Sequence, residues 1–165
     1  YKIEKINVHG GSNRIWVQHK HANKDRTVED NLNLERILGL DSVSTYDKFA
    51  ESVAKSRDDL VNILNRCKDN NHKVISYGAT SKSTTVFNYC NIDTSMIDYI
   101  TDTTPEKQGL CSPGMHIPII SPEEGITNEV DFAYLGAWNF AQEIKEKENR
   151  FYGKFITHVP TVRIL

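Results

Sequence analysis

The sequence has little of what marks the specialised protein classes. Its three cysteines, Cys67, Cys90 and Cys111, are scattered and form no C-x-x-C pair. This excludes a disulfide framework and favours a reducing cytoplasm. The six histidines do not share a zinc-binding spacing with the cysteines, so we expect no metal in this chain. No apolar run approaches the roughly 18–20 residues of a membrane span, and no signal peptide is visible.

The sequence also has no large excess of positive or negative charge. Twenty Lys and Arg against 22 Asp and Glu give a net charge of −2, which provides no basic surface for nucleic acid. A local field can still bind one phosphorylated small molecule. The 165 residues, of which 38% are hydrophobic and 25% charged, suit a soluble globular domain. Because the chain opens at Tyr1 directly in strand-like sequence, we interpret it as a piece of a longer protein.

Periodicity divides the chain into two parts. Residues 1–20 alternate around a His-Gly-Gly-Ser break and predict a strand pair, and a short helix is expected over 28–39. We assign residues 1–40 to a segment that leads out of a preceding domain. An apolar stripe at helical spacing then runs from Tyr46 to Cys67 and predicts a long amphipathic helix at the start of a domain spanning 41–165.

Strands and helices alternate after residue 72. The expected helices cover 81–89 and 139–148, with a helical turn at Pro122, and the expected strands cover 73–77, 96–101, 116–120, 131–137, 154–159 and 162–165. Such alternation implies a mostly parallel sheet with helices on both faces. The predicted fold class is therefore α/β, a Rossmann-like three-layer domain preceded by the strand pair and the long helix.

The stretch YGATSKSTT, residues 77–85, joins the first of these strands to a helix. Gly78 lets the backbone approach a ligand closely, and amides near Ser81 at the helix start favour an anion. Lys82 adds a movable positive charge. The stretch matches neither G-x-G-x-x-G nor the P-loop pattern, and a plain tight turn explains it equally well.

Asp102 strengthens the nucleotide interpretation. It lies 24 positions after Gly78, at the end of the second predicted strand. An acidic residue about 20 positions after the glycine turn can accept hydrogen bonds from ribose hydroxyls. The role of a turn former explains Asp102 equally well, and pattern alone does not choose between the two roles.

Two further clusters could serve binding. The long connection from Lys107 to His116 could border a site, with both side chains reaching phosphate or sugar, or be turn chemistry alone. His9, beside two glycines, could be a general base, although an incidental hairpin residue is favoured. Trp138 could stack on a base, although a place in the core is favoured. No pattern for nucleophilic catalysis is present, so no catalytic residue is assigned.

Taken in order along the chain, several of these stretches resemble one known family. They are HGGS-x-R (9–14), YGA-x-x-K (77–82), NYC-x-I (88–92), D-x-x-P-x-K-x-G (102–109), PG-x-HIPI (113–119), WNF (138–140) and GKFI (153–156). They are similar to the carboxyl-terminal domain of nucleotide-sugar C-methyltransferases, S-adenosylmethionine-dependent enzymes that methylate a ring carbon of a keto-deoxysugar.

The resemblance implies a division of labour within a longer chain. In the family, zinc and S-adenosylmethionine belong to upstream domains, as does a Tyr-His-Glu-His catalytic motif that this sequence lacks. The chain is therefore expected to bind the nucleotide diphosphate sugar next to the upstream methyltransferase domain. Gly78, Ser81 and Lys82 would meet the diphosphate, Asp102 a nucleoside hydroxyl, and the stretch from Lys107 to His116 would border the site.

Three positions depart from the family pattern. Ser83 stands where glycine is common after the lysine, Thr103 where an arginine often follows the aspartate, and Ala137 where proline often precedes the tryptophan. The nucleotide, the sugar and the methylated carbon are therefore left open. Two other functions also stay open: a dinucleotide-binding oxidoreductase domain, which the single glycine disfavours, and a nonenzymatic docking or dimerisation domain.

Overall fold

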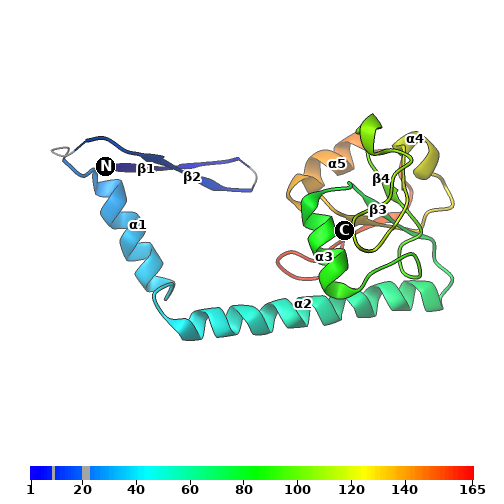
Figure 1. The fold of residues 1–165 in the computed structure, drawn as a ribbon, viewed down its shortest axis with the longest axis horizontal. Coiled ribbons are helices and arrows are strands. Elements are labelled where there is room, and N and C mark those ends of the chain that lie inside the picture. Colours follow the sequence, from blue (N-terminus) through cyan, green and yellow to red (C-terminus); the bar gives the residue numbers. More distant parts are fainter. Residues whose placement is uncertain (9, 20–22) are drawn as a thin grey trace. The chain divides into compact units, whose positions relative to one another are not determined.

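The computed structural model describes residues 1–8, 10–19 and 23–165. They form two compact units, Tyr1–Ser52 and Val53–Leu165, which divide within one long helix, α2 (Val43–Asp69; Figure 1). The domain boundary expected after residue 40 stays a prediction. No helix in the described ranges is long and apolar enough to cross a membrane.

The first unit contains the predicted strand pair and short helix. Strands β1 (Lys2–Ile6) and β2 (Ser12–Trp16) form an antiparallel hairpin in which Ile3 lies opposite Ile15. Helix α1 (Arg26–Ile37) begins after Asp25, whose carboxylate accepts a hydrogen bond from the Thr27 amide. The prediction of two strands followed by a helix is confirmed.

The second unit has the predicted six-stranded, mostly parallel sheet. Its strand order is β5-β4-β3-β6-β7-β8, and only the β7–β8 pair is antiparallel. The strands are β3 (Val74–Tyr77), β4 (Ile100–Thr101), β5 (Ile119–Ile120), β6 (Phe132–Leu135), β7 (Lys154–Thr157) and β8 (Arg163–Ile164). Every residue of β3 is buried, as expected for a central strand covered on both faces.

All six strands are shorter than predicted, and β4 and β5 keep only two residues each. The segment before β4 turns instead of extending, because the amides of Met96 and Ile97 both donate to the Asp93 carbonyl. The segment before β5 contains Pro118, which has no amide to donate, and it forms an isolated bridge with Cys111. The expected helix over 139–148 is likewise divided into a 3₁₀ turn, η2 (Trp138–Phe140), and α5 (Ala141–Lys147).

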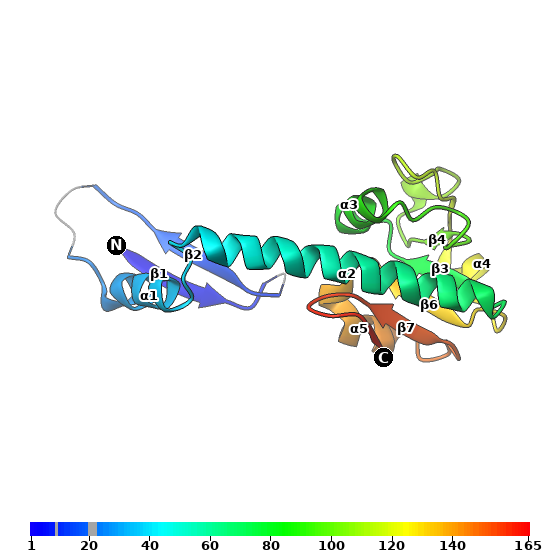
Figure 2. The same cartoon turned by 90° about the horizontal axis from the view of Figure 1, so that it is seen from below.

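Two apolar clusters make the sheet the middle of three layers. The carboxyl-terminal half of α2 and α3 (Ser81–Cys90) cover one face, and α5 packs on the other (Figure 2). The first cluster includes Leu60, Leu64, Phe87 and Tyr134; the second includes Ile75, Tyr77, Leu135, Ile144 and Phe155. This layering leaves the carboxyl ends of the parallel strands open at one edge of the sheet.

Leu60 tests the packing of α2 in the 165-residue chain. Leu60 is fully buried, whereas Phe49, on the same helix, is exposed. We expect Leu60→Ala to lower the free energy of unfolding by about 2–5 kcal/mol. Phe49→Ala, the matched control, should change it by less than about 0.5 kcal/mol in urea titrations. Equal losses from both substitutions would contradict this packing.

Candidate functional site

The turn after β3 is fixed by two glycines. Gly78 has φ of +95°, a conformation that residues with a side chain rarely adopt. Gly136, after β6, lies so close that a Cβ there would be 2.4 Å from the Gly78 carbonyl oxygen. The loops that follow two adjacent parallel strands therefore touch at backbone level, at the carboxyl edge of the sheet.

Helix α3 starts from this turn with a capping box. The Thr80 hydroxyl accepts from the Ser83 amide at 3.1 Å, and the Ser83 hydroxyl accepts from the Thr80 amide at 3.0 Å. The Thr80 hydroxyl also donates to the Gly136 carbonyl at 2.8 Å. In the described residues, the amides of Ser81 and Lys82 have no such partner. These two amides at the positive end of the helix dipole are available to an anion.

Asp102 holds two loops together. Its Oδ2 accepts from the Ala79 amide at 2.7 Å and from Lys107 Nζ at 3.2 Å, while Oδ1 accepts from the Thr104 amide at 2.9 Å. Lys107 Nζ also donates to the Ala79 carbonyl at 2.8 Å. We call Asp102, Lys107, Ala79 and Thr104 the loop clamp. It locks the glycine turn to the connection after β4.

The loop clamp explains the acidity of Asp102. Burial acts to raise the pKa of this carboxyl group, which is 8% exposed. The hydrogen bonds from Thr104, Lys107 and Ala79 favour the carboxylate more strongly, so the pKa lies below its ordinary value of 3.8. Asp102 is therefore ionised at neutral pH, and Oδ1 keeps room for one more donor.

A cleft of about 270 Å³ opens beside the loop clamp, above the ends of β3, β4 and β6. It is lined by Tyr77, Gly78, Thr80, Thr101, Asp102, Thr103, Thr104, Ala137, Phe140, Glu143, Ile144 and Lys147. The Tyr77 hydroxyl donates to Glu148 at 2.7 Å, and burial together with this bond raises the pKa of Tyr77. The charged groups that line the cleft are two carboxylates, from Asp102 and Glu143, and one ammonium group, from Lys147. Negative charge therefore exceeds positive charge in the cleft.

The structure brings some of the predicted site residues together. Gly78 and Asp102 line the cleft, and Lys107 is bound to Asp102. Ser81 and Lys82 lie in the exposed first turn of α3, where Lys82 Nζ is 6.0 Å from the centre of the Trp138 ring. These residues share the carboxyl edge of the sheet, as the sequence predicted.

His116 lies elsewhere. It is exposed, and its turn adjoins the carboxyl-terminal half of α3, where the Asn88 side-chain amide donates to the Pro113 carbonyl. The lining of the cleft does not include His116. Lys107, at the start of the predicted connection, thus belongs to the loop clamp, whereas His116, at its end, lies away from the cleft. His9 lies outside the described residues.

Sequence reasoning missed a histidine at the same edge. His158 follows β7, and its Nδ1 is 3.0 Å from the hydroxyl of buried Tyr134. The Trp138 ring meets the imidazole edge-on at 4.9 Å between ring centres. Burial lowers the pKa of His158 and raises that of Tyr134, so both are neutral at pH 7. The place of His158 just after a parallel strand was the signal that could have found it.

Asn139, in the turn after β6, is a second residue that was missed. Its Nδ2 and Oδ1 are shielded from solvent and have no hydrogen-bond partner among the described residues. A buried amide without partners is costly, because both groups have lost their water. The side-chain amide of Asn139 therefore has a donor and an acceptor that no described residue uses. In the sequence, only the pattern Trp-Asn-Phe pointed to this residue.

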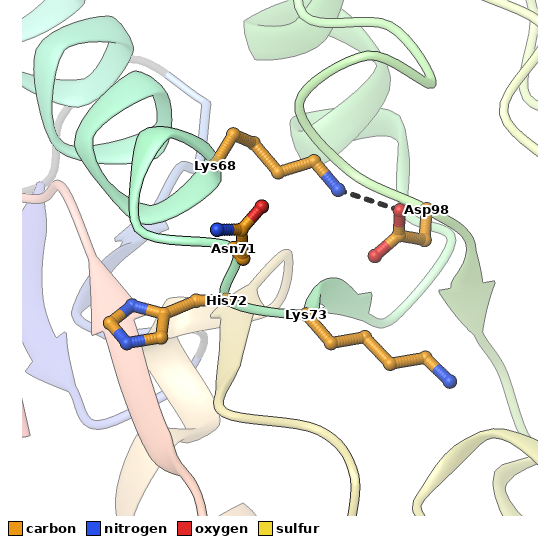
Figure 3. A pocket seen from close by; sticks show the side chains of 5 residues that line it. All are labelled: Lys68, Asn71, His72, Lys73 and Asp98. Atoms are coloured by element: carbon orange, nitrogen blue, oxygen red, sulfur yellow. Dashed lines mark hydrogen bonds and ion pairs between the residues drawn. The ribbon is translucent and has the colours of Figure 1, made fainter.

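A second hollow of about 410 Å³ lies at the opposite, amino edge of the sheet (Figure 3). Lys68, Asn71, His72, Lys73 and Asp98 line it. Lys68 Nζ is paired with Asp98 Oδ1 at 2.7 Å, and Asp98 Oδ2 accepts from the Val74 amide at 3.3 Å. These bonds tie the end of α2 to the sheet, so we assign the hollow a structural role and favour the cleft as the candidate site.

Comparison with known proteins identifies the family of the chain. Residues 7–160 match a family described as "C-methyltransferase C-terminal domain". The chain belongs to this family. It is also 31% identical, over 168 aligned positions, to a protein of Streptomyces niveus named "C-methyltransferase NovU". That alignment covers 99% of this chain but 40% of the relative.

In this C-methyltransferase C-terminal domain, the family match includes every residue of the cleft and the loop clamp. The described residues contain no group of three or more His, Cys, Asp or Glu side chains placed to hold a metal ion. The chemistry that the cleft offers is hydrogen bonding and charge, supplied by the ends of the parallel strands and the first turn of α3.

The loop clamp predicts a pH-dependent loss of stability. Because the pKa of Asp102 is lowered on folding, its contribution is fully present above 3.8, the unfolded value, and is lost as pH falls through the folded pKa. We expect Asp102→Asn to lower the free energy of unfolding at pH 7 by about 1–3 kcal/mol. The gap to wild type should narrow below pH 3.8.

The control is Asp69→Asn, at an exposed position at the end of α2. It should change stability by less than about 0.5 kcal/mol at either pH. A gap between Asp102→Asn and wild type that stays constant down to pH 2 would contradict the role of the carboxylate.

Proposed function

We propose that this chain is the substrate-binding region of an S-adenosylmethionine-dependent C-methyltransferase that acts on a nucleotide-linked keto-deoxysugar. The observation that supports this most is the meeting, at one edge of the sheet, of a glycine turn, two free helix amides, Lys82 and the cleft beside Asp102. Family membership supplies the class of reaction, and the resemblance in sequence supplies the class of substrate.

The charges of the cleft and of the start of α3 suit different parts of the proposed ligand. Asp102 and Glu143 in the cleft would repel a diphosphate but accept hydrogen bonds from sugar hydroxyls or base N–H groups. The first turn of α3, with Lys82 and two free amides, suits the diphosphate. We therefore assign the nucleoside to the cleft and the diphosphate to the start of α3.

The size of the cleft agrees with a shared site. At about 270 Å³ it is slightly smaller than the roughly 300–1,000 Å³ of complete small-molecule pockets. It would hold one part of a nucleotide sugar while the reacting sugar ring extends into the preceding methyltransferase domain. The proposal assigns zinc and S-adenosylmethionine, the source of the methyl group, to upstream parts of the protein.

The role of this chain would be positioning. Fixing two reactants in near-attack geometry can contribute about 7–11 kcal/mol at the extreme. Binding energy from the remote nucleotide can be used to orient the sugar ring at the methyl donor. Gly78, the loop clamp and Lys82 would supply that binding energy without touching the reacting carbon.

Ligand titration distinguishes this proposal from the two alternatives. We expect thymidine, uridine, cytidine or guanosine diphosphate to raise the melting temperature of the 165-residue chain, with S-adenosylmethionine giving no change. Stabilisation by NAD alone would identify a dinucleotide-binding oxidoreductase domain. If no nucleotide stabilises either this chain or the full-length protein, a docking domain without a substrate site is the better function.

Lys82 tests the position of the diphosphate. In the full-length enzyme, we expect Lys82→Ala to weaken nucleotide-sugar binding and to lower kcat/KM about tenfold or more, since a charged hydrogen bond contributes about 1.5–3 kcal/mol. Lys145→Ala, on the exposed side of α5, is the matched control and should leave both quantities unchanged. Unchanged kcat/KM in Lys82→Ala would rule out this role.

A further inference from the structure

The imidazole of His158 is held in one orientation by its neighbours. His158 follows β7, and its ring stacks on that of Tyr134, with 5.7 Å between the ring centres and 29° between the planes. Trp138 meets the same imidazole edge-on, at 4.9 Å between ring centres. The His158 carbonyl accepts a hydrogen bond from the Ser56 hydroxyl, on α2, at 3.3 Å. Contacts from three elements therefore fix both the backbone and the ring of this residue.

Tyr134 decides which nitrogen of His158 carries the proton. The side chain of Tyr134 is fully buried, and among the described residues its hydroxyl has one hydrogen-bond partner, His158 Nδ1 at 3.0 Å. A buried hydroxyl group needs an acceptor for its proton. Burial raises the pKa of Tyr134 and lowers that of His158, so the phenol stays protonated and the imidazole neutral at pH 7. Nδ1 is therefore the acceptor, and the imidazole proton lies on Nε2.

The protonated Nε2 of His158 is available to a ligand. It donates no hydrogen bond to a described residue, and, unlike the side-chain amide of Asn139, it is not shielded from solvent. The residue as a whole is half-buried. Because the ring is already fixed, the binding of an acceptor at Nε2 would cost little further ordering of the side chain. The structure thus presents one N–H donor in a set direction.

The order of the strands sets the place of His158 relative to the cleft. Across the sheet the order runs β4, β3, β6, β7, and these strands are parallel, so their carboxyl ends lie at one edge. Asp102 follows β4, the start of α3 follows β3, and His158 follows β7. Since neighbouring strands lie about 4.8 Å apart, the end of β7 lies roughly 10 Å from the end of β3. It lies on the side of β3 that faces away from Asp102.

Trp138 connects this position to the start of α3. Its ring centre is 6.0 Å from Lys82 Nζ, and its edge meets the imidazole of His158. The ammonium group of Lys82 and the imidazole therefore adjoin the same indole ring, although their residues are 76 positions apart in the chain. One extended ligand that binds Lys82 can reach His158 by passing along Trp138.

We propose that His158 is a substrate-binding residue whose Nε2–H donates a hydrogen bond to an oxygen of the sugar in the nucleotide sugar. A diphosphate joins nucleoside to sugar, so the two groups leave it in different directions. With the nucleoside beside Asp102 and the diphosphate at the start of α3, the sugar extends over β6 toward His158. The inference rests on the proposed function and adds to it a contact for the half of the substrate that reacts.

Nitrogen NMR tests the position of the imidazole proton without any ligand. In the 165-residue chain labelled with nitrogen-15 histidine, at pH 7, we expect His158 to show a protonated Nε2 and an unprotonated Nδ1. The loss of these signals in His158→Asn assigns them. In Tyr134→Phe the hydroxyl donor to Nδ1 is gone, so we expect a mixture of the two tautomers. A proton on Nδ1 in the unaltered chain would overturn the proposal, because Nε2 would then have no proton to donate.

Paired ligands test the contact with the sugar in the full-length enzyme. The probes are thymidine, uridine, cytidine and guanosine diphosphate, each compared with the same diphosphate joined to glucose. His158→Asn keeps an acceptor for Tyr134 but has no group at the position of Nε2, whereas His158→Gln carries an amide N–H there. For the nucleoside that binds, His158→Asn should weaken the glucose form about three- to tenfold, the effect of one neutral hydrogen bond, and leave the diphosphate unchanged. His158→Gln should restore most of this affinity.

Equal melting temperatures of His158→Asn and His158→Gln would show that the difference in binding is not a loss of folding, since both variants lack the ring. His116→Asn is the matched control: His116 is exposed, lies away from the cleft and has a positive φ that asparagine tolerates, so affinity for both ligands should stay unchanged.

Two results would overturn this contact alone. If His158→Asn weakens the diphosphate as much as the glucose form, the hydrogen bond goes to a phosphate and the assignment to the sugar is wrong. If it weakens neither, His158 does not bind the substrate. A third result is distinct from these: if no probe binds even the unaltered enzyme, the proposed function and this contact are both overturned.

Discussion

The candidate site depends on one carboxylate, Asp102. It stands at the end of β4 and accepts hydrogen bonds from the loop after β3, from its own loop and from Lys107. Without it, the Ala79 amide and Lys107 would lose the acceptor that they share at the strand ends. Losing any of the three donors would leave a buried charge less well compensated, so these hydrogen bonds hold the two loops in one arrangement.

The rest of the second unit positions this carboxylate. Because the sheet is parallel, its strands end at the same edge, and the loops after β3, β4 and β6 meet there. Gly136 permits the backbone contact with Gly78, and the capping box of α3 fixes the direction of the helix that follows. The apolar layers on both faces keep the strand ends in register, so the loops that follow the strands start from a rigid core.

The two units differ in how much apolar surface each buries within itself. The second unit buries apolar side chains in two clusters, one on each face of its sheet. In the first, no described residue is buried, and many of its large hydrophobic side chains are exposed.

The order of strands and helices, the glycine turn and the acidic strand end could all be predicted from the sequence, because periodicity, capping and turn chemistry act over a few residues. Short strands were overextended where Pro118 and the turn at Asp93 interrupt them. The tertiary structure alone decided that Asp102 is bound to Ala79 and Lys107, that His116 lies away from the cleft, and that His158 meets Tyr134. Those contacts join residues far apart in the chain, and which segments meet is set by packing across the sheet, a property no local pattern records.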